Sequence, residues 1–234
     1  MNALDFIILI AAPLIGGFAA LLLKTKSREH YKLVLSFSGA FLFSITLIHL
    51  FPVVFANNEH AGVYVLAGFF IQIFLEQLTH GIEHGHFHEH IENNSYIFAL
   101  LLGLTIHSFL DGIPLSNHQM LDDGHHSLLY GISVHKIPEG FALASVLLFS
   151  NYKKWNVLVF VVLFSLVAPA AVLLSNQFSA VDAPIFSIIV AMAVGSFLHV
   201  STTILFESES GQHLFGRKKI FAILLGAGIA LLTI

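Results

Sequence analysis

The chain has 234 residues, of which 56% are hydrophobic and only 10% are charged, and its mean hydropathy is +0.85. This composition lies outside the usual range of soluble globular domains and indicates a protein that crosses a membrane several times. The formal net charge of −4 gives no reason to expect nucleic acid as a partner, and the absence of cysteine excludes disulfides and thiolate metal sites.

Runs of about 20 apolar residues, the length needed to cross the hydrocarbon core, predict an all-α protein with eight transmembrane helices. The runs do not alternate between apolar and polar residues, as the strands of a membrane barrel would. We expect one transmembrane domain over residues 1–234. Its predicted spans are Phe6–Leu23, Leu33–Phe55, Val63–Thr79, Tyr96–Leu115, Leu128–Phe149, Trp155–Leu174, Ala183–Phe206 and Ile220–Ile234.

The lysines and arginines predict the orientation of these spans. All of them except Lys136 lie in the first, fifth and seventh loops. The positive-inside rule places these loops in the cytoplasm and therefore both termini outside it. The first basic cluster follows the first apolar run instead of preceding it, so a cleaved signal peptide is not expected. The short loops favour a bacterial inner membrane.

The fourth and fifth spans carry two related stretches, HSFLDGIPL from His107 and HKIPEGFAL from His135. Each places a histidine four residues before a carboxylate, so His107 shares a helix face with Asp111, and His135 with Glu139. An ionisable group in the bilayer costs at least about 2.5–3.5 kcal/mol and usually marks an ion pathway or finds a partner. Imidazole combined with carboxylate suits zinc and neighbouring divalent metals. We predict that the four residues bind one cation; interhelical hydrogen bonding is the alternative.

The chain resembles the ZIP family of divalent metal-ion transporters. The resemblance rests on HSFLDG from His107 and HKIPEG from His135, on eight spans with outside termini, and on a histidine-rich third loop. It implies a transporter, not an enzyme, that takes zinc, or iron, manganese or cadmium, into the cytoplasm. The metal would be the transported ion and not a cofactor. The resemblance also implies a homodimer in which spans one, four, five and six move against the others.

Three positions depart from the ZIP pattern. Many relatives carry Asn, Asp or Glu after each motif histidine, where they help to hold a second metal, and a glutamate before the proline of the sixth span. Here these positions are Ser108, Lys136 and Ala168. A protonated lysine has no lone pair for a metal, so we expect its ammonium to replace the second ion and to neutralise Asp111 or Glu139. Alternatively, Lys136 turns towards water or a carbonyl.

A short internal similarity suggests a repeat. The letters GAFLFS at Gly39 and GSFLHV at Gly195 share a G-[AS]-F-L core in the second and seventh spans. These spans run in opposite directions, which is typical of an inverted repeat. We predict a repeat of spans one to three and six to eight around spans four and five; chance similarity of four residues is the alternative.

Other histidines and carboxylates extend the predicted metal path. The third loop, residues 80–95, is expected to be cytoplasmic and to receive or sense the metal, or to be a solvated linker that binds metal incidentally. Glu76 either extends the path into the third span or is an ordinary interfacial carboxylate. Within the spans, His49 and His199 are either stations for the ion or helix-packing groups. The loop residues expected to bind metal are His80, Glu83, His84, His86, His88 and His90.

Two other functions are compatible with the same residues. An intramembrane metal-dependent hydrolase would use a metal with an open position to activate water. The sequence contains no HExxH motif, although this absence does not decide the matter. A metal-responsive membrane receptor would bind the ion without moving it.

Overall fold

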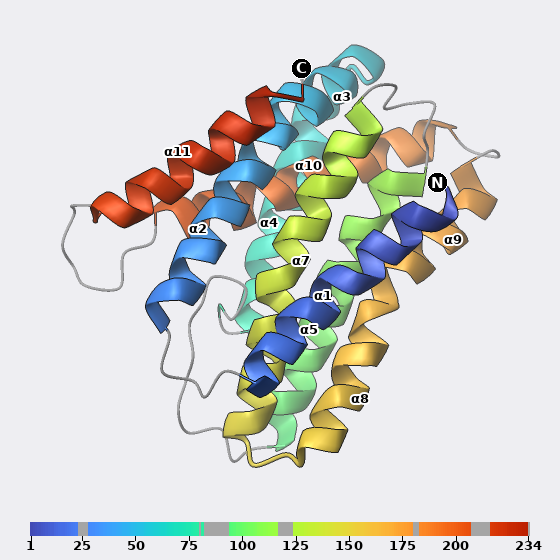
Figure 1. The fold of residues 1–234 in the computed structure, drawn as a ribbon. Helices are drawn as coiled ribbons and strands as arrows, with labels where there is room; N and C mark the ends of the chain where they lie inside the picture. The colour runs from blue at the N-terminus through green and yellow to red at the C-terminus, as the bar shows by residue number, and fades with distance from the viewer. Residues whose placement is uncertain are drawn as a thin grey trace.

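The computed structural model describes residues 1–22, 28–79, 81, 94–116, 124–179, 183–206 and 216–233, and all regular structure in them is helical (Figure 1). A π-helical turn, η1 (Thr46–Leu50), joins α2 to α3, and a 3-10 segment, η3 (Ile113–Ser116), follows α5. The α-helices are α1 (Ala3–Leu22), α2 (Arg28–Ile45), α3 (Phe51–Asn57), α4 (Ala61–Thr79), α5 (Asn94–Gly112), α7 (Gly124–Phe149), α8 (Lys154–Ser165), α9 (Val167–Ser179), α10 (Ala183–Phe206) and α11 (Arg217–Leu231).

Seven helical segments among the described residues are long and apolar enough to cross a membrane. They coincide with the first seven predicted spans to within a few residues. The predicted eighth span coincides with α11, whose 15 residues fall short of the usual crossing length. The all-α membrane fold is therefore confirmed, whereas the eighth span and the inverted repeat stay predictions. The seven segments are Ala3–Leu22, Tyr31–Asn57, Ala61–Thr79, Ser95–Ser116, His125–Phe149, Lys154–Gln177 and Pro184–Phe206.

Prolines coincide with two irregularities in these spans. The second span passes through the π-helical turn η1, which ends two residues before Pro52, and the sixth breaks at Leu166, three residues before Pro169. Proline has no backbone N–H, and its ring clashes with the carbonyl of the residue four positions earlier. For Pro169 that residue is Ser165, the last residue of α8. By contrast, α7 continues through Pro138.

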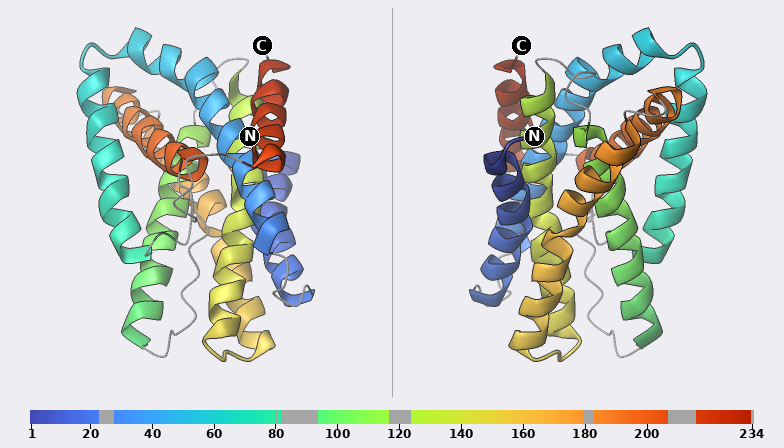
Figure 2. Two further views of the ribbon diagram at one scale, coloured as in Figure 1. Left: turned by 90° about the vertical axis from the view of Figure 1, so that its left-hand side faces the viewer. Right: turned by 90° about the vertical axis from the view of Figure 1, so that its right-hand side faces the viewer.

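Helices that are distant in the sequence pack in close pairs, α1 with α7, α2 with α11 and α4 with α10. In Figure 2, α4 and α10 lie on one side of the bundle, and α1 and α7 lie on the other. Glycines allow the closest approaches. A Cβ atom at Gly16 or Gly140 would lie 1.9 or 2.1 Å from a carbonyl oxygen across the α1–α7 contact. At Gly68 or Gly195, across the α4–α10 contact, the distance would be 1.8 or 1.9 Å. Close contacts of small residues are a main source of helix association in membranes.

The outer surface carries many exposed apolar side chains. Phe74 and Trp155 are each 71% exposed, as expected for side chains that contact lipid.

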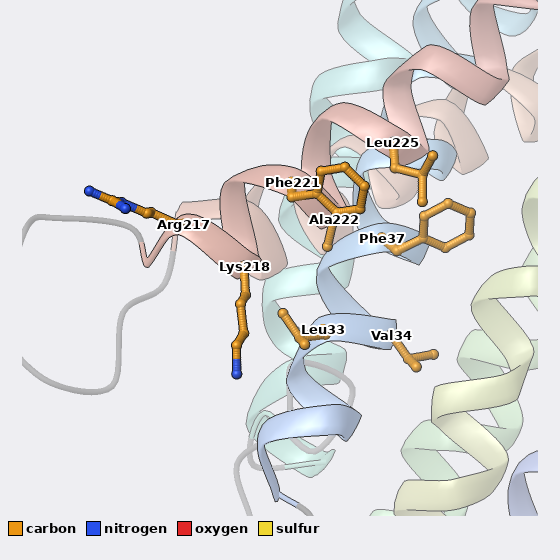
Figure 3. Close-up of a pocket in the computed structure, with 8 residues that line it drawn as sticks. All are labelled: Leu33, Val34, Phe37, Arg217, Lys218, Phe221, Ala222 and Leu225. Atoms are coloured by element: carbon orange, nitrogen blue, oxygen red, sulfur yellow. The ribbon is translucent and has the colours of Figure 1, made fainter.

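An apolar groove of about 520 Å³ lies between α2 and α11 (Figure 3). Phe37 and Phe221 line it, and Arg217 at its end points away from it (Figure 3). The groove has no histidine or carboxylate in its lining, so it is not a candidate metal site.

The glycine contact between α4 and α10 makes a testable prediction. The substitution Gly195→Ala places a methyl group against the backbone carbonyl of Val65, which cannot move aside without separating the helices. We expect a loss of about 1–3 kcal/mol in stability, measured as a lower thermal unfolding temperature in detergent. Gly228→Ala is the matched control, because nothing lies within 4 Å of its Cβ position. Equal unfolding temperatures for the two variants would contradict this account of the packing.

Candidate metal centre

The two motif helices bring their polar side chains together in the interior. His107 and Asp111 lie on α5, and His135, Lys136 and Glu139 lie on α7. Each of these residues is at most 1% exposed. The expected pairs are formed within each helix, with His107 Nε2 3.4 Å from Asp111 Oδ2 and His135 Nε2 3.1 Å from Glu139 Oε1. The four-residue spacing thus places each imidazole beside its carboxylate.

Glu139 joins the two helices through one of its oxygen atoms. Its Oε1 lies 3.1 Å from Nε2 of both His107 and His135. The two imidazole rings stand nearly perpendicular, with their centroids 6.2 Å apart. One ligand atom from each of these three residues falls within 4.8 Å of the other two. Two imidazole nitrogens and a carboxylate oxygen so placed fit a divalent transition-metal ion, which binds such atoms at about 2.0–2.2 Å.

Lys136 occupies the other side of the carboxylates. Its Nζ donates hydrogen bonds to Asp111 Oδ2 at 2.5 Å and to Glu139 Oε2 at 2.7 Å. The same ammonium lies 5.9 Å from the centre of the Phe164 ring on α8. Lys136 is among the largest fully buried side chains of the described residues. Glu139 therefore directs one oxygen to the two imidazoles and the other to the ammonium of Lys136.

Three polar atoms of the cluster have no hydrogen-bond partner among the described residues. These are Asp111 Oδ1 and both ring nitrogens of His135, although His135 Nε2 lies 3.1 Å from Glu139 Oε1. A buried polar atom without a partner costs about 1–3 kcal/mol. Such atoms are a common sign of a site that completes its interactions with water or an ion.

The glycine after each carboxylate has a packing role. A Cβ atom at Gly112 would lie 2.4 Å from the carbonyl oxygen of Ala168 on α9, and one at Gly140 would lie 2.1 Å from that of Pro13 on α1. Consecutive residues of a helix are rotated by about 100°. The carboxylate can therefore point into the cluster while the next residue lets the helix contact a neighbour.

Among the remaining predicted residues of the spans, Ser108 directly follows His107 on α5 and is buried. His49 lies in η1, where its Nε2 is 3.0 Å from Thr233 Oγ1 near the end of the chain. Glu76 of α4 and His199 of α10 form their own pair, with Oε2 and Nε2 2.6 Å apart. Their side chains are 23% and 10% exposed, so this pair is less buried than the cluster.

The expected loop ligands fall outside the described residues. These are His80, Glu83, His84, His86, His88 and His90.

Sequence reasoning missed a polar contact to His107 from α4. Gln72 Oε1 lies 3.2 Å from His107 Nδ1 and accepts a hydrogen bond from Ser196 Oγ at 2.8 Å. Gln72 is fully buried. Its position four residues before Glu76, on one face of an apolar span, is a signal that would have found it.

The comparison with known families agrees with this geometry. Residues 83–233 match the sequence profile of the family described as the ZIP zinc transporters. The match covers well over half of the chain and includes both motif helices and all five residues of the buried cluster. The resemblance noted from the two motifs is confirmed, and the chain belongs to the ZIP zinc transporter family.

Proposed function

We propose that this protein transports a divalent transition-metal cation, zinc above all, into the cytoplasm through a site formed by His107, Asp111, His135 and Glu139. The observation that carries the proposal is the meeting of two imidazole nitrogens and Glu139 Oε1 in a fully buried position between α5 and α7. Membership of a transporter family supports movement of the ion over catalysis.

The ligand types favour zinc and its neighbours. Calcium and magnesium sites use oxygen ligands almost alone, whereas imidazole suits zinc, iron, copper and nickel. Three protein ligands leave a position open on a tetrahedral ion, as in sites that exchange a ligand. Asp111 Oδ2, 3.4 Å from His107 Nε2, is an additional carboxylate oxygen that can enter as the ion arrives or leaves.

Lys136 supports a single transported ion in this region. Its ammonium lies where Asp111 and Glu139 would otherwise share a second cation. An ammonium donates hydrogen bonds and offers no lone pair, so it neutralises carboxylates without binding metal. In this proposal Lys136 replaces the second ion that other ZIP proteins hold, and Ser108 does not restore a carboxylate there.

The proposed route continues from the buried site along α4. Glu76 and His199 form a partly exposed pair one helical turn beyond Gln72, on the way to the third loop. Metal would pass from the centre to this pair and then to the loop histidines, while His49 would act on the opposite side.

The same proposal includes the architecture and location of the protein. It has eight spans with an inverted repeat and both termini outside the cytoplasm, and it forms a homodimer in a bacterial inner membrane. Crosslinking of copies and protease accessibility of the termini check two of these points.

The direct test is zinc uptake by the purified protein in liposomes. We expect four single variants to lower the uptake rate by at least about 10–100-fold: His107→Ala, His135→Ala, Asp111→Ala and Glu139→Ala. Loss of a residue that only orients a metal ligand already costs about this much, so loss of a ligand itself should cost at least as much. His60→Ala is the control, because His60 is exposed in the turn before α4.

Uptake should also fall as the pH is lowered through the acidic range, because protons compete with metal for imidazole and carboxylate.

Other outcomes of this test favour the other functions. Binding of zinc without uptake would indicate a receptor, and zinc-dependent hydrolysis of a peptide or lipid without uptake would indicate an enzyme. Unchanged uptake in all four alanine variants would exclude the proposed site.

The role of Lys136 predicts the number of bound ions. In the full-length protein with the five loop histidines replaced, native mass spectrometry should count one zinc ion per protomer. Lys136→Met removes the ammonium and leaves two carboxylate oxygens without a cation, so we expect a lower unfolding temperature without metal and a larger increase on adding zinc. Lys136→Asp combined with Ala168→Glu should bind a second ion. Two zinc ions in the otherwise unchanged spans would contradict the proposal.

The histidine-rich third loop is expected to tune transport without performing it. Replacing His80, His84, His86, His88 and His90 by alanine should leave most of the liposome uptake rate intact, because these residues lie outside the predicted spans. The expected change is in the metal concentration at which uptake responds. Complete loss of uptake in a folded variant would show that the loop belongs to the essential path.

A further inference from the structure

The side of His107 that faces away from the carboxylates meets a buried amide. Its Nδ1 lies 3.2 Å from Gln72 Oε1, while its Nε2 lies 3.1 Å from Glu139 Oε1. Ser196 Oγ donates to the same amide oxygen at 2.8 Å. All three residues are at most 4% exposed, so water does not compete freely for these contacts.

This arrangement has a consequence for the protonation of His107. A carboxamide oxygen only accepts hydrogen bonds, so a bond to it requires the proton of a neutral imidazole to be on Nδ1. The lone pair of the ring is then on Nε2, which faces Glu139 and His135. Metal-binding histidines commonly hold their other ring nitrogen in this way, which fixes the tautomer and the orientation of the ring.

Close packing of α4 and α10 holds the amide in place. Gly68 lies one turn before Gln72, and Gly195 directly precedes Ser196. Both glycines contact backbone atoms of the opposite helix more closely than any other residue type would allow. The hydroxyl of Ser196 is therefore brought within reach of the amide oxygen, and the pair presents a fixed acceptor to α5.

We propose that Gln72, held by Ser196, is a positioning residue that sets the tautomer of His107 and so prepares its Nε2 to bind the transported metal. The inference rests on the proposed function, because it assigns the acceptor that orients one of its ligands. Gln72 itself lies on the far side of the imidazole and does not bind the ion. The contact makes the affinity of a site on α5 and α7 depend on the α4–α10 pair.

The test measures zinc affinity by calorimetry on the full-length protein in detergent, with the five loop histidines replaced. Gln72→Met keeps the length of the side chain and removes the acceptor, so the dissociation constant should rise about 10–100-fold. Gln72→Glu keeps an acceptor for the Nδ1 proton, so it should bind zinc at least as tightly as the unchanged residue. Ser196→Ala should give a smaller loss of affinity.

Ser201→Ala is the matched control. Ser201 is a buried serine of the same helix whose hydroxyl bonds to Phe197 O in its own helix, so its loss should leave the dissociation constant unchanged. Unchanged affinity in Gln72→Met, or equal losses in Gln72→Met and Gln72→Glu, would overturn the inference. If Gln72→Met does not fold, the inference requires unweakened zinc affinity in Gln72→Glu and a loss of affinity in Ser196→Ala. A failure of either result would then overturn it. Absence of zinc binding in the protein with Gln72 intact would instead count against the proposed function.

Discussion

Two carboxylates enclosed in an apolar bundle require positive charge, and the centre of the molecule is arranged around this requirement. Asp111 and Glu139 are each 1% exposed, and an unpaired buried charge costs several kcal/mol. Lys136 contacts both, so with neutral imidazoles the cluster keeps one net negative charge. That charge is directed through Glu139 Oε1 towards two imidazole nitrogens. Lys136 thereby neutralises the cluster in part, and the remaining negative charge lies beside the two imidazole nitrogens.

The same charges must be held at fixed positions on helices that have little other polar structure. In both motifs this is achieved by the residue after the carboxylate. Gly112 and Gly140 bring α5 against α9 and α7 against α1 at distances that no side chain would permit. A larger residue would displace the helix axis and with it the adjacent carboxylate. The recurrence of carboxylate and glycine together is therefore a packing constraint on the buried cluster as well as a chemical pattern.

Sequence reasoning succeeded where the governing physics is local. Span length follows from the thickness of the hydrocarbon core, and the pairing of His107 with Asp111 follows from helix geometry. For Lys136 the sequence predicts a contact with Asp111 or Glu139, but that it contacts both depends on how α5 faces α7. The hydrogen bond from His107 to Gln72 depends likewise on the packing of α4 beside α5. The predicted metal ligands of the third loop lie outside the described residues.

The contact between α4 and α10 shows how close packing determines which polar groups can be used. Gly68, Gln72 and Glu76 follow one another at four-residue intervals, so they form one stripe on α4. On α10, Ser196 reaches the amide and His199 reaches the carboxylate. The first pair is almost fully buried, and the second is partly exposed. A neutral amide costs less to enclose than a carboxylate. The stripe thus places the uncharged acceptor where water is excluded and the charged one where water can still reach it.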